Sequence, residues 1–277
     1  MRLLSVVLPG VLLTLVACNG IFEPRFPPAA IAIAPSSQYR TWWSVVESCS
    51  GRRSTFESVT WYTIPVGQLK VKGEMAAGAW FPSGNRIVIT DSWKREGALV
   101  RHEMLHAVLQ TASHPAEFFQ QKCGQVVACP IGDCAGNQSL PDAIESSIDA
   151  LQVDAELHPP TPSFTGEGGL ATVLVKVRNP TNATVFVPVQ SFAASQCPIG
   201  YVIESTSLPA WTELGCSYPA SAGDGRIYFR PGQTVTALFE VNLGSATYGA
   251  RPHPGDVRFI AIIADNFRKT IATSILP

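Results

Sequence analysis

The pattern of apolar and polar residues divides the chain into two parts with different periodicity. In the first part, apolar residues at helical spacing predict a short helix over 39–49. A longer helix is expected to follow Asp91-Ser92, which can cap it, and to run to about Gln110. Between the helices, segments rich in β-branched and aromatic residues predict strands over 56–64, 79–81 and 86–90. The first part should therefore be mixed α and β.

The second part, after about residue 148, alternates apolar and polar residues with a period of two. Turn signals such as Asn179-Pro180 and Pro231-Gly232 separate the segments. The expected strands are 151–157, 172–177, 183–189, 201–204, 226–229, 234–241 and 256–263. So many short strands within about 120 residues predict an antiparallel β-sandwich. The strand pattern resembles an immunoglobulin-like domain, and also the bacterial intracellular proteinase-inhibitor fold.

The N-terminus has the layout of an export signal. Arg2 precedes an uncharged apolar run from Leu3 to Ala17, which is shorter than the ~20 residues that span a bilayer. Residues 15–18, Leu-Val-Ala-Cys, resemble the bacterial lipoprotein box, in which the cysteine becomes lipid-modified and begins the mature chain. This resemblance implies a protein anchored through Cys18 to a bacterial membrane, on its periplasmic or cell-surface face. An ordinary signal peptide with an incidental Cys18 is the alternative.

Composition excludes two classes of protein. A hydrophobic content of 46% is ample for a packed core, which argues against disorder of the whole chain. The formal net charge is −1 and there is no basic run, so the chain lacks the electrostatic footprint of a nucleic-acid-binding protein.

The chain has 7 cysteines, an odd number. With Cys18 as the lipid attachment site, the disulfide candidates are Cys49, Cys123, Cys129, Cys134, Cys197 and Cys216. In an oxidising compartment these can form up to three disulfides in any of about 15 pairings. Proximity favours Cys197–Cys216 and leaves the other four to pair within the first part. A zinc site formed by Cys123, Cys129 and Cys134 is an alternative, although their spacing is not Cys-x-x-Cys.

The clearest chemistry lies in His102-Glu103-Met104-Leu105-His106, inside the longer predicted helix. Residues four apart lie on one face of a helix, so both imidazoles can converge on one metal ion. Glu103 is offset by about 100° around the helix, so its carboxylate can reach a water at the metal without binding the metal. Apolar neighbours on both sides predict a buried helix, in which these polar groups are costly unless something satisfies them.

This motif is the His-Glu-x-x-His signature of the zincin metallopeptidases, and the chain resembles a zincin of minimal type. The resemblance implies that His102 and His106 bind Zn²⁺, and that Glu103 is the general base that activates a zinc-bound water for attack on a peptide carbonyl. It also implies that the strand 86–90 is the sheet edge that aligns an extended peptide substrate.

The third metal ligand has two candidates. His114 follows the expected helix end, and in minimal zincins a third histidine is followed four positions later by a phenylalanine beneath the site, here Phe118. The step from His106 to His114 is longer than in metzincins, and their glycine is missing. Glu145 is the alternative, because Glu-x-x-x-Asp resembles the helix of the gluzincins. Since the strands of the second part are expected to begin near Ile148, we favour His114.

The expected fold is thus an α+β zincin-like domain with a buried motif helix, followed by an all-β immunoglobulin-like sandwich. The expected segments are a signal peptide over 1–17, a Pro-rich tether over 18–38, the zincin-like domain over 39–140 and the sandwich over 141–277.

Two functional hypotheses follow. The first is zinc-dependent hydrolysis of a peptide or protein substrate by a membrane-anchored exported lipoprotein. The second is a non-catalytic surface binding lipoprotein, in which the metal site is vestigial or structural and the sandwich is an interaction module.

Overall fold

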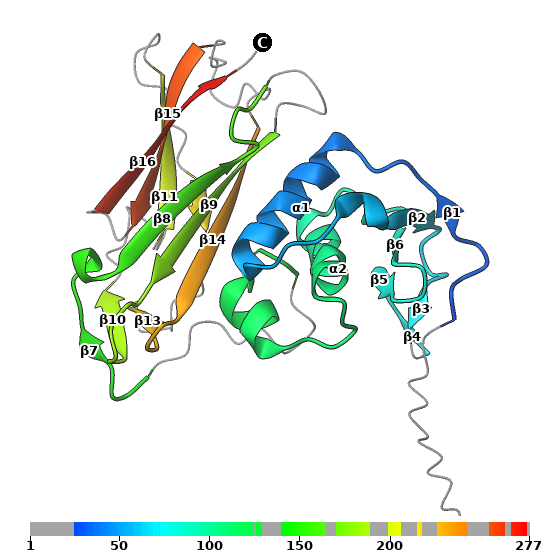
Figure 1. The fold of residues 1–277 in the computed structure, drawn as a ribbon, viewed down its shortest axis with the longest axis horizontal. Helices are drawn as coiled ribbons and strands as arrows, with labels where there is room; N and C mark the ends of the chain where they lie inside the picture. Colours follow the sequence, from blue (N-terminus) through cyan, green and yellow to red (C-terminus); the bar gives the residue numbers. More distant parts are fainter. Residues whose placement is uncertain are drawn as a thin grey trace, which may run out of the picture.

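The protein has a mixed α+β fold in which helices lie between a small sheet and a larger group of strands (Figure 1). The computed structural model describes residues 25–71, 73–124, 126–128, 140–163, 170–188, 199–205, 215–217, 226–242, 255–263 and 267–275. The helical segments are α1 (Ser37–Ser50), the 3-10 turn η1 (Phe56–Ser58), α2 (Gly97–Leu109), the π-helix η2 (Glu117–Lys122) and the 3-10 turn η3 (Ile148–Ala150). Among the described residues, no helix has the length and apolar character needed to cross a bilayer.

The strands fall into a group before α2 and a group after η2. The first group is β1 (Ile31–Ala32), β2 (Thr60–Ile64), β3 (Lys70–Val71), β4 (Glu74–Met75), β5 (Gly78–Phe81) and β6 (Arg86–Thr90). The second is β7 (Ile144–Glu145), β8 (Gln152–His158), β9 (Leu170–Arg178), β10 (Val185–Pro188), β11 (Ile199–Ser205), β12 (Gly215–Ser217), β13 (Arg226–Phe229), β14 (Thr234–Asn242), β15 (Gly255–Ile263) and β16 (Phe267–Ile275).

The first sheet has the strand order β1-β2-β6-β5. Strand β6 pairs parallel with β2 and antiparallel with β5, so it lies inside the sheet. The prediction that 86–90 forms the edge is therefore wrong. Among the described residues β5 pairs only with β6, and it is β5 that forms the edge beside α2.

Helix α1 forms where the sequence predicts it. Its buried face carries large apolar side chains, including Trp42, Trp43 and Val46, each at most 4% exposed. The helix ends at Gly51, which adopts the left-handed conformation (φ 67°) and donates its N–H to the carbonyl of Glu47. Burial of each large side chain contributes about 1.5–3 kcal/mol, which is enough to fix a helix of this length against its neighbours.

Helix α2 begins later than the sequence indicates. Residues 91–95 form turns, and the helix begins at Gly97. The expected cap, Asp91, is engaged elsewhere, because its carboxylate accepts a hydrogen bond from Thr63 Oγ1 (2.6 Å) and lies 3.6 Å from Lys94 Nζ. The segment 56–64 is likewise shorter as a strand, since its first residues form η1.

The second group of strands forms three small sheets around one hydrophobic core. Their orders are β14-β9-β8, β12-β11-β15-β16 and β13-β10-β7. The core draws residues from several of them, such as Val173, Phe229, Phe239 and Phe259. Most pairs are antiparallel as predicted, but β7 pairs parallel with β10. Neither a closed barrel nor a clear two-sheet sandwich is evident among the described residues.

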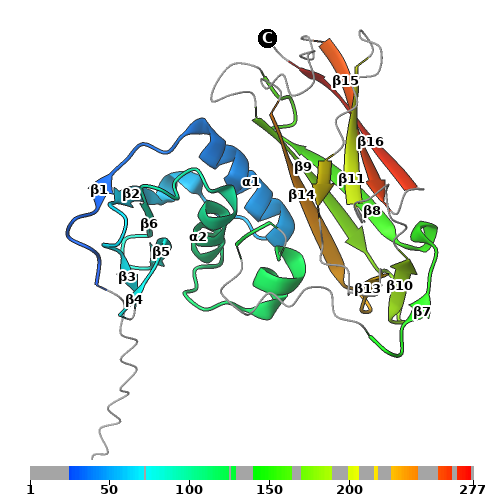
Figure 2. The ribbon, with the colours of Figure 1, turned by 180° about the vertical axis from the view of Figure 1, so that it is seen from behind.

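Strands β8, β9 and β14 lie beside the helices in both views (Figures 1 and 2). Leu174 of β9 is buried in the same apolar cluster as residues of α1 and α2. Thr236 Oγ1 of β14 donates to the carbonyl of Lys122 at the end of η2 (2.8 Å). The core of the first part thus extends onto the face of this sheet.

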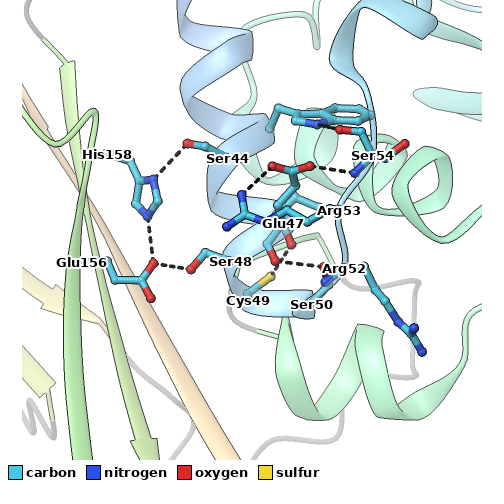
Figure 3. Close-up of polar contacts among 12 residues, drawn as sticks. Ser44, Glu47, Ser48, Cys49, Ser50, Arg52, Arg53, Ser54, Glu156 and His158 are labelled. Carbon is cyan, nitrogen blue, oxygen red and sulfur yellow. Dashed lines mark hydrogen bonds and ion pairs between the residues drawn. The ribbon is translucent and has the colours of Figure 1, made fainter.

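A polar cluster joins α1 to strands β8 and β9, and we call it the α1–β8 junction (Figure 3). Ser44 Oγ lies 2.9 Å from His158 Nδ1, and His158 Nε2 lies 3.2 Å from Glu156 Oε2. Ser48 Oγ donates to the same carboxylate, and Lys176 Nζ donates to Glu156 Oε1 (2.5 Å). Hydrogen bonds from His158, Lys176 and Ser48 hold the pKa of Glu156 well below its usual range.

One predicted disulfide pairing lies within the described residues. Cys49, in the last turn of α1, is bonded to Cys123, directly after η2. Cys123 is therefore not a thiolate ligand, and the alternative of a zinc site built on it is wrong. Outside the described residues lie Cys18, Cys129, Cys134, Cys197 and the side chain of Cys216.

Candidate metal centre

Helix α2 brings the two histidines of the motif together. His102 and His106 lie one turn apart, and their Nε2 atoms are separated by 3.2 Å. Both side chains are buried, at 8% and 6% exposure for the whole residue. Helical spacing alone produces this convergence, as the sequence predicts.

Backbone carbonyl groups orient both imidazole rings. His102 Nδ1 lies 2.7 Å from the carbonyl oxygen of Ala128, and His106 Nδ1 lies 2.7 Å from that of Thr111. Since a carbonyl can only accept, each Nδ1 carries the proton and donates it. Each Nε2 therefore presents a bare lone pair toward the other ring. The lone pairs of the two Nε2 atoms face each other, and neither nitrogen has a proton to donate to the other. A metal cation bound between them satisfies both lone pairs.

Both imidazoles are neutral at physiological pH. Burial lowers the pKa of His102 to about 4 and that of His106 to about 3. Proximity to His114 lowers both pKa values further, while the hydrogen bonds to the carbonyls oppose these shifts. Neutral imidazole is the form that binds metal ions, so no deprotonation is needed before a metal can bind.

His114 joins the pair from the loop that follows α2. The helix ends where expected, because Gln110 adopts the left-handed conformation (φ 52°) and its N–H bonds to the carbonyl of His106. The chain then turns back, and His114 Nε2 lies 3.0 Å from His102 Nε2. One ligand atom from each of His102, His106 and His114 lies within 4.8 Å of the other two, and His114 is exposed to solvent. The three histidines therefore fit a metal ion with one open side.

Glu103 is offset from His102 around the helix and packs against the edge strand β5. It is 4% exposed, and the backbone N–H of Trp80 in β5 donates to its carboxylate. Burial raises its pKa to about 8. A Cβ added to Gly78 would lie 3.0 Å from Glu103 Cγ and Oε1, so the missing side chain of Gly78 is what lets β5 approach the carboxylate.

An aromatic ring supports all three histidines, but it belongs to Phe119 and not to Phe118 as predicted. The centroid of the Phe119 ring lies 5.0 Å from that of His102 and 4.8 Å from those of His106 and His114. Both phenylalanines lie in the first turn of η2, where their N–H groups bond to the carbonyl of Pro115. Phe118 lies under Lys122 Nζ, 4.8 Å from its centroid.

The alternative ligand Glu145 does not join the group. It is exposed in β7, where it pairs with Phe186 of β10. A short strand there leaves no room for the Glu-x-x-x-Asp helix, and the group that could hold a metal consists of the three histidines without the alternative ligand Glu145.

Several residues that shape the site were not predicted. No sequence motif marks these residues, which are Gly78 and Trp80 of β5, Thr111 and Ala128 through their carbonyl groups, and the buried Arg101. The one sequence signal was Arg101, because a charged residue directly before His102 in an otherwise apolar helix needs a partner.

Comparison with known proteins identifies no family. No protein-family model matches the chain, and no curated protein matches it. Partial structural similarity is found to a β-glucosidase from Listeria innocua in complex with glucose, with TM-score 0.32, 12% identity, and coverage of 46% of this chain and 16% of that chain. It is also found to the Pseudomonas fluorescens alkylpurine DNA glycosylase AlkC bound to DNA containing an abasic site analog, with TM-score 0.32, 11% identity, and coverage of 46% and 31%.

A third partial match is the β-glucosidase EmGH1 from Erythrobacter marinus, with TM-score 0.30, 11% identity, and coverage of 78% of this chain and 28% of that chain. In these matches the aligned region spans less than a third of the solved structure. Similarity at this level carries no information on function, which therefore has to be argued from the site.

Proposed function

We propose that this chain is a zinc-dependent peptidase of a minimal zincin type. The observation that carries the proposal is the convergence of His102, His106 and His114 beside Glu103. Three imidazole ligands with an open fourth position are typical of catalytic zinc sites, whereas structural sites are closed by four protein ligands. Neutral imidazole nitrogens also suit zinc better than magnesium or calcium, which prefer oxygen ligands.

The proposed chemistry assigns each residue a separate task. Zinc held by the three histidines would act as a Lewis acid and lower the pKa of water toward about 7. Glu103 takes up a proton from the attacking water and later delivers it to the leaving amine. The N–H of Trp80 holds the carboxylate in place for both transfers. The positive charge of a bound zinc ion would favour the ionised form of the buried Glu103 carboxyl. Glu103 must be ionised to accept a proton at neutral pH.

The edge strand β5 suits an extended peptide substrate. Among the described residues its outer edge has no partner strand, and Glu103 lies directly against Gly78. We propose that the substrate backbone lies along β5, in place of the strand 86–90 that the sequence indicated.

The wider organisation is also a proposal. Residues 1–17 act as a lipoprotein signal, Cys18 carries the lipid, and 39–140 and 141–277 form the peptidase domain and an immunoglobulin-like sandwich. The tether is shorter than the expected 18–38, because β1 belongs to the first sheet and α1 begins at Ser37. The Cys49–Cys123 disulfide supports export, since disulfides persist in oxidising compartments. Labelling with radioactive palmitate should mark the wild type and not Cys18→Ser.

Metal analysis and hydrolysis of a casein mixture test the proposed function together. The full chain purified in detergent should contain one zinc per molecule and cleave casein, and His102→Ala should lose both. Glu103→Gln should retain zinc and lose hydrolysis. Persistent cleavage of casein by Glu103→Gln would contradict the role of Glu103 as the base. A wild type that holds no zinc would favour the alternative, a non-catalytic binding lipoprotein.

A further inference from the structure

Arg101 is a buried cation next to a proposed zinc ligand. Its side chain is 4% exposed, and its guanidinium makes two short contacts. Nε donates to the carbonyl of Val126 (2.6 Å), and Nη1 donates to Glu240 Oε1 (2.7 Å). Glu240 belongs to β14, so the counter-charge comes from the group of strands that follows η2. A buried guanidinium without its counter-ion is strongly unfavourable, so this pair fixes where Arg101 lies.

The carboxylate of Glu240 is itself held in place. Its Oε1 also accepts a hydrogen bond from Trp42 Nε1 of α1 (2.8 Å). A Cβ at Gly97 would lie 2.6 Å from Arg101 Nη1, 2.9 Å from Glu240 Oε1 and 2.9 Å from Trp42 Cζ2. The first residue of α2 is therefore a glycine because the ion pair lies directly over it.

Arg101 fastens the backbone segment that orients His102. Val126 accepts from Arg101, the N–H of Ala128 donates to the carbonyl of Ala98 (2.8 Å), and the carbonyl of Ala128 accepts from His102 Nδ1 (2.7 Å). This last bond fixes the tautomer and the ring orientation of His102. Arg101 is thus one of the groups that hold this segment, together with the carbonyl groups of Ala98 and Cys123, and Arg101 in turn is paired with Glu240.

We propose that Glu240 is a positioning residue of the metal centre, which acts through Arg101 and the segment 126–128 to hold His102. The strands that follow η2 are then part of the metal site and not only an attached module. This inference rests on the proposed zinc site. Loss of an outer partner of a zinc-ligating histidine costs 10–100-fold in metal affinity, and Glu240→Gln should weaken zinc binding by about tenfold.

The test compares two polar contacts between the same parts of the chain. Glu240→Gln removes the charge at Arg101 and keeps the shape of the side chain. Glu156→Gln makes the same change in the α1–β8 junction, whose hydrogen bonds among the described residues do not involve the segment 126–128. Zinc affinity of the full chain is measured by competition with a chelator, and the ligand geometry by the visible spectrum of the Co²⁺-substituted protein.

The proposal expects Glu240→Gln to weaken zinc binding about tenfold and to change the cobalt spectrum, while Glu156→Gln leaves both unchanged. Gly97→Ala, which pushes the pair apart without altering a charge, should reproduce the effect of Glu240→Gln and serves in its place if that variant fails to fold. Unchanged zinc affinity, or equal weakening by both glutamine variants, would overturn the proposal. A wild type that binds zinc without cleaving casein contradicts the proposed function and leaves this inference standing.

Discussion

Replacing Glu103 by glutamine should stabilise the metal-free protein at neutral pH, although it removes the proposed base. Burial raises the pKa of this carboxyl to about 8, against an ordinary value of 4.5. At a pH between these two pKa values, the Glu103 carboxyl is protonated in the folded chain and ionised in the unfolded chain. The free energy of unfolding therefore falls as the pH rises from about 4.5 to about 8, and changes no further above that.

The size of the effect follows from the same values. At pH 7 the pH lies about 2.5 units above the pKa of the unfolded carboxyl, and each unit is worth ~1.4 kcal/mol, so burial of the carboxyl costs about 3.5 kcal/mol. Glutamine is neutral in both states, and its amide oxygen can accept the N–H of Trp80. The variant should avoid this cost at pH 7 and show no advantage near pH 4.5.

Urea unfolding in the presence of a chelator measures this difference. The gap between Glu103→Gln and wild type should widen steadily between about pH 5 and pH 8. Glu117→Gln is the matched control, because Glu117 is an exposed glutamate of η2 that pairs with Lys122, and it should show no such widening. A gap that stays constant with pH, or a less stable Glu103→Gln at pH 7, would show that the carboxyl is not held neutral in the folded protein.

Three further predictions concern the surroundings of the site. Replacing both Cys49 and Cys123 by alanine should lower the free energy of unfolding in urea by roughly 4 kcal/mol, because the disulfide closes a long loop; an unchanged urea midpoint would contradict this. Gly78→Ala should leave zinc affinity intact but reduce kcat about tenfold, because the added Cβ displaces the Glu103 carboxylate. An unaltered kcat would show that strand β5 moves instead of the carboxylate. Phe119→Leu should weaken zinc binding several-fold in chelator competition, because a ring that contacts three imidazoles is lost, and Phe118→Leu is its control.

The parts of the site that depend on local spacing could be predicted from the sequence. The four-residue step from His102 to His106 is a property of any helix, and the end of α2 near Gln110 was expected. His114 could be proposed from its position after the helix, although the turn that brings it back depends on a left-handed Gln110. A non-glycine residue in this conformation carries no signal in the sequence.

The features that were missed depend on contacts distant in sequence or on local irregularities. Arg101 and Glu240 are separated by 139 residues, and no periodicity links them. The order of strands in the first sheet depends on pairing, which is why β5 and not β6 is the edge. Phe119 and Phe118 are adjacent, and only the fold of the segment after His114 decides which ring contacts the histidines.

The Cys49–Cys123 bond has a consequence for the covalent integrity of the site. The edge strand β5, Glu103 and all three histidines lie between the two cysteines, which are 74 residues apart in sequence. A single peptide bond cut anywhere in this interval leaves both pieces joined through sulfur. A nicked molecule would keep its entire metal centre on one particle, and it would run as one band on a gel without reductant and as two bands with it.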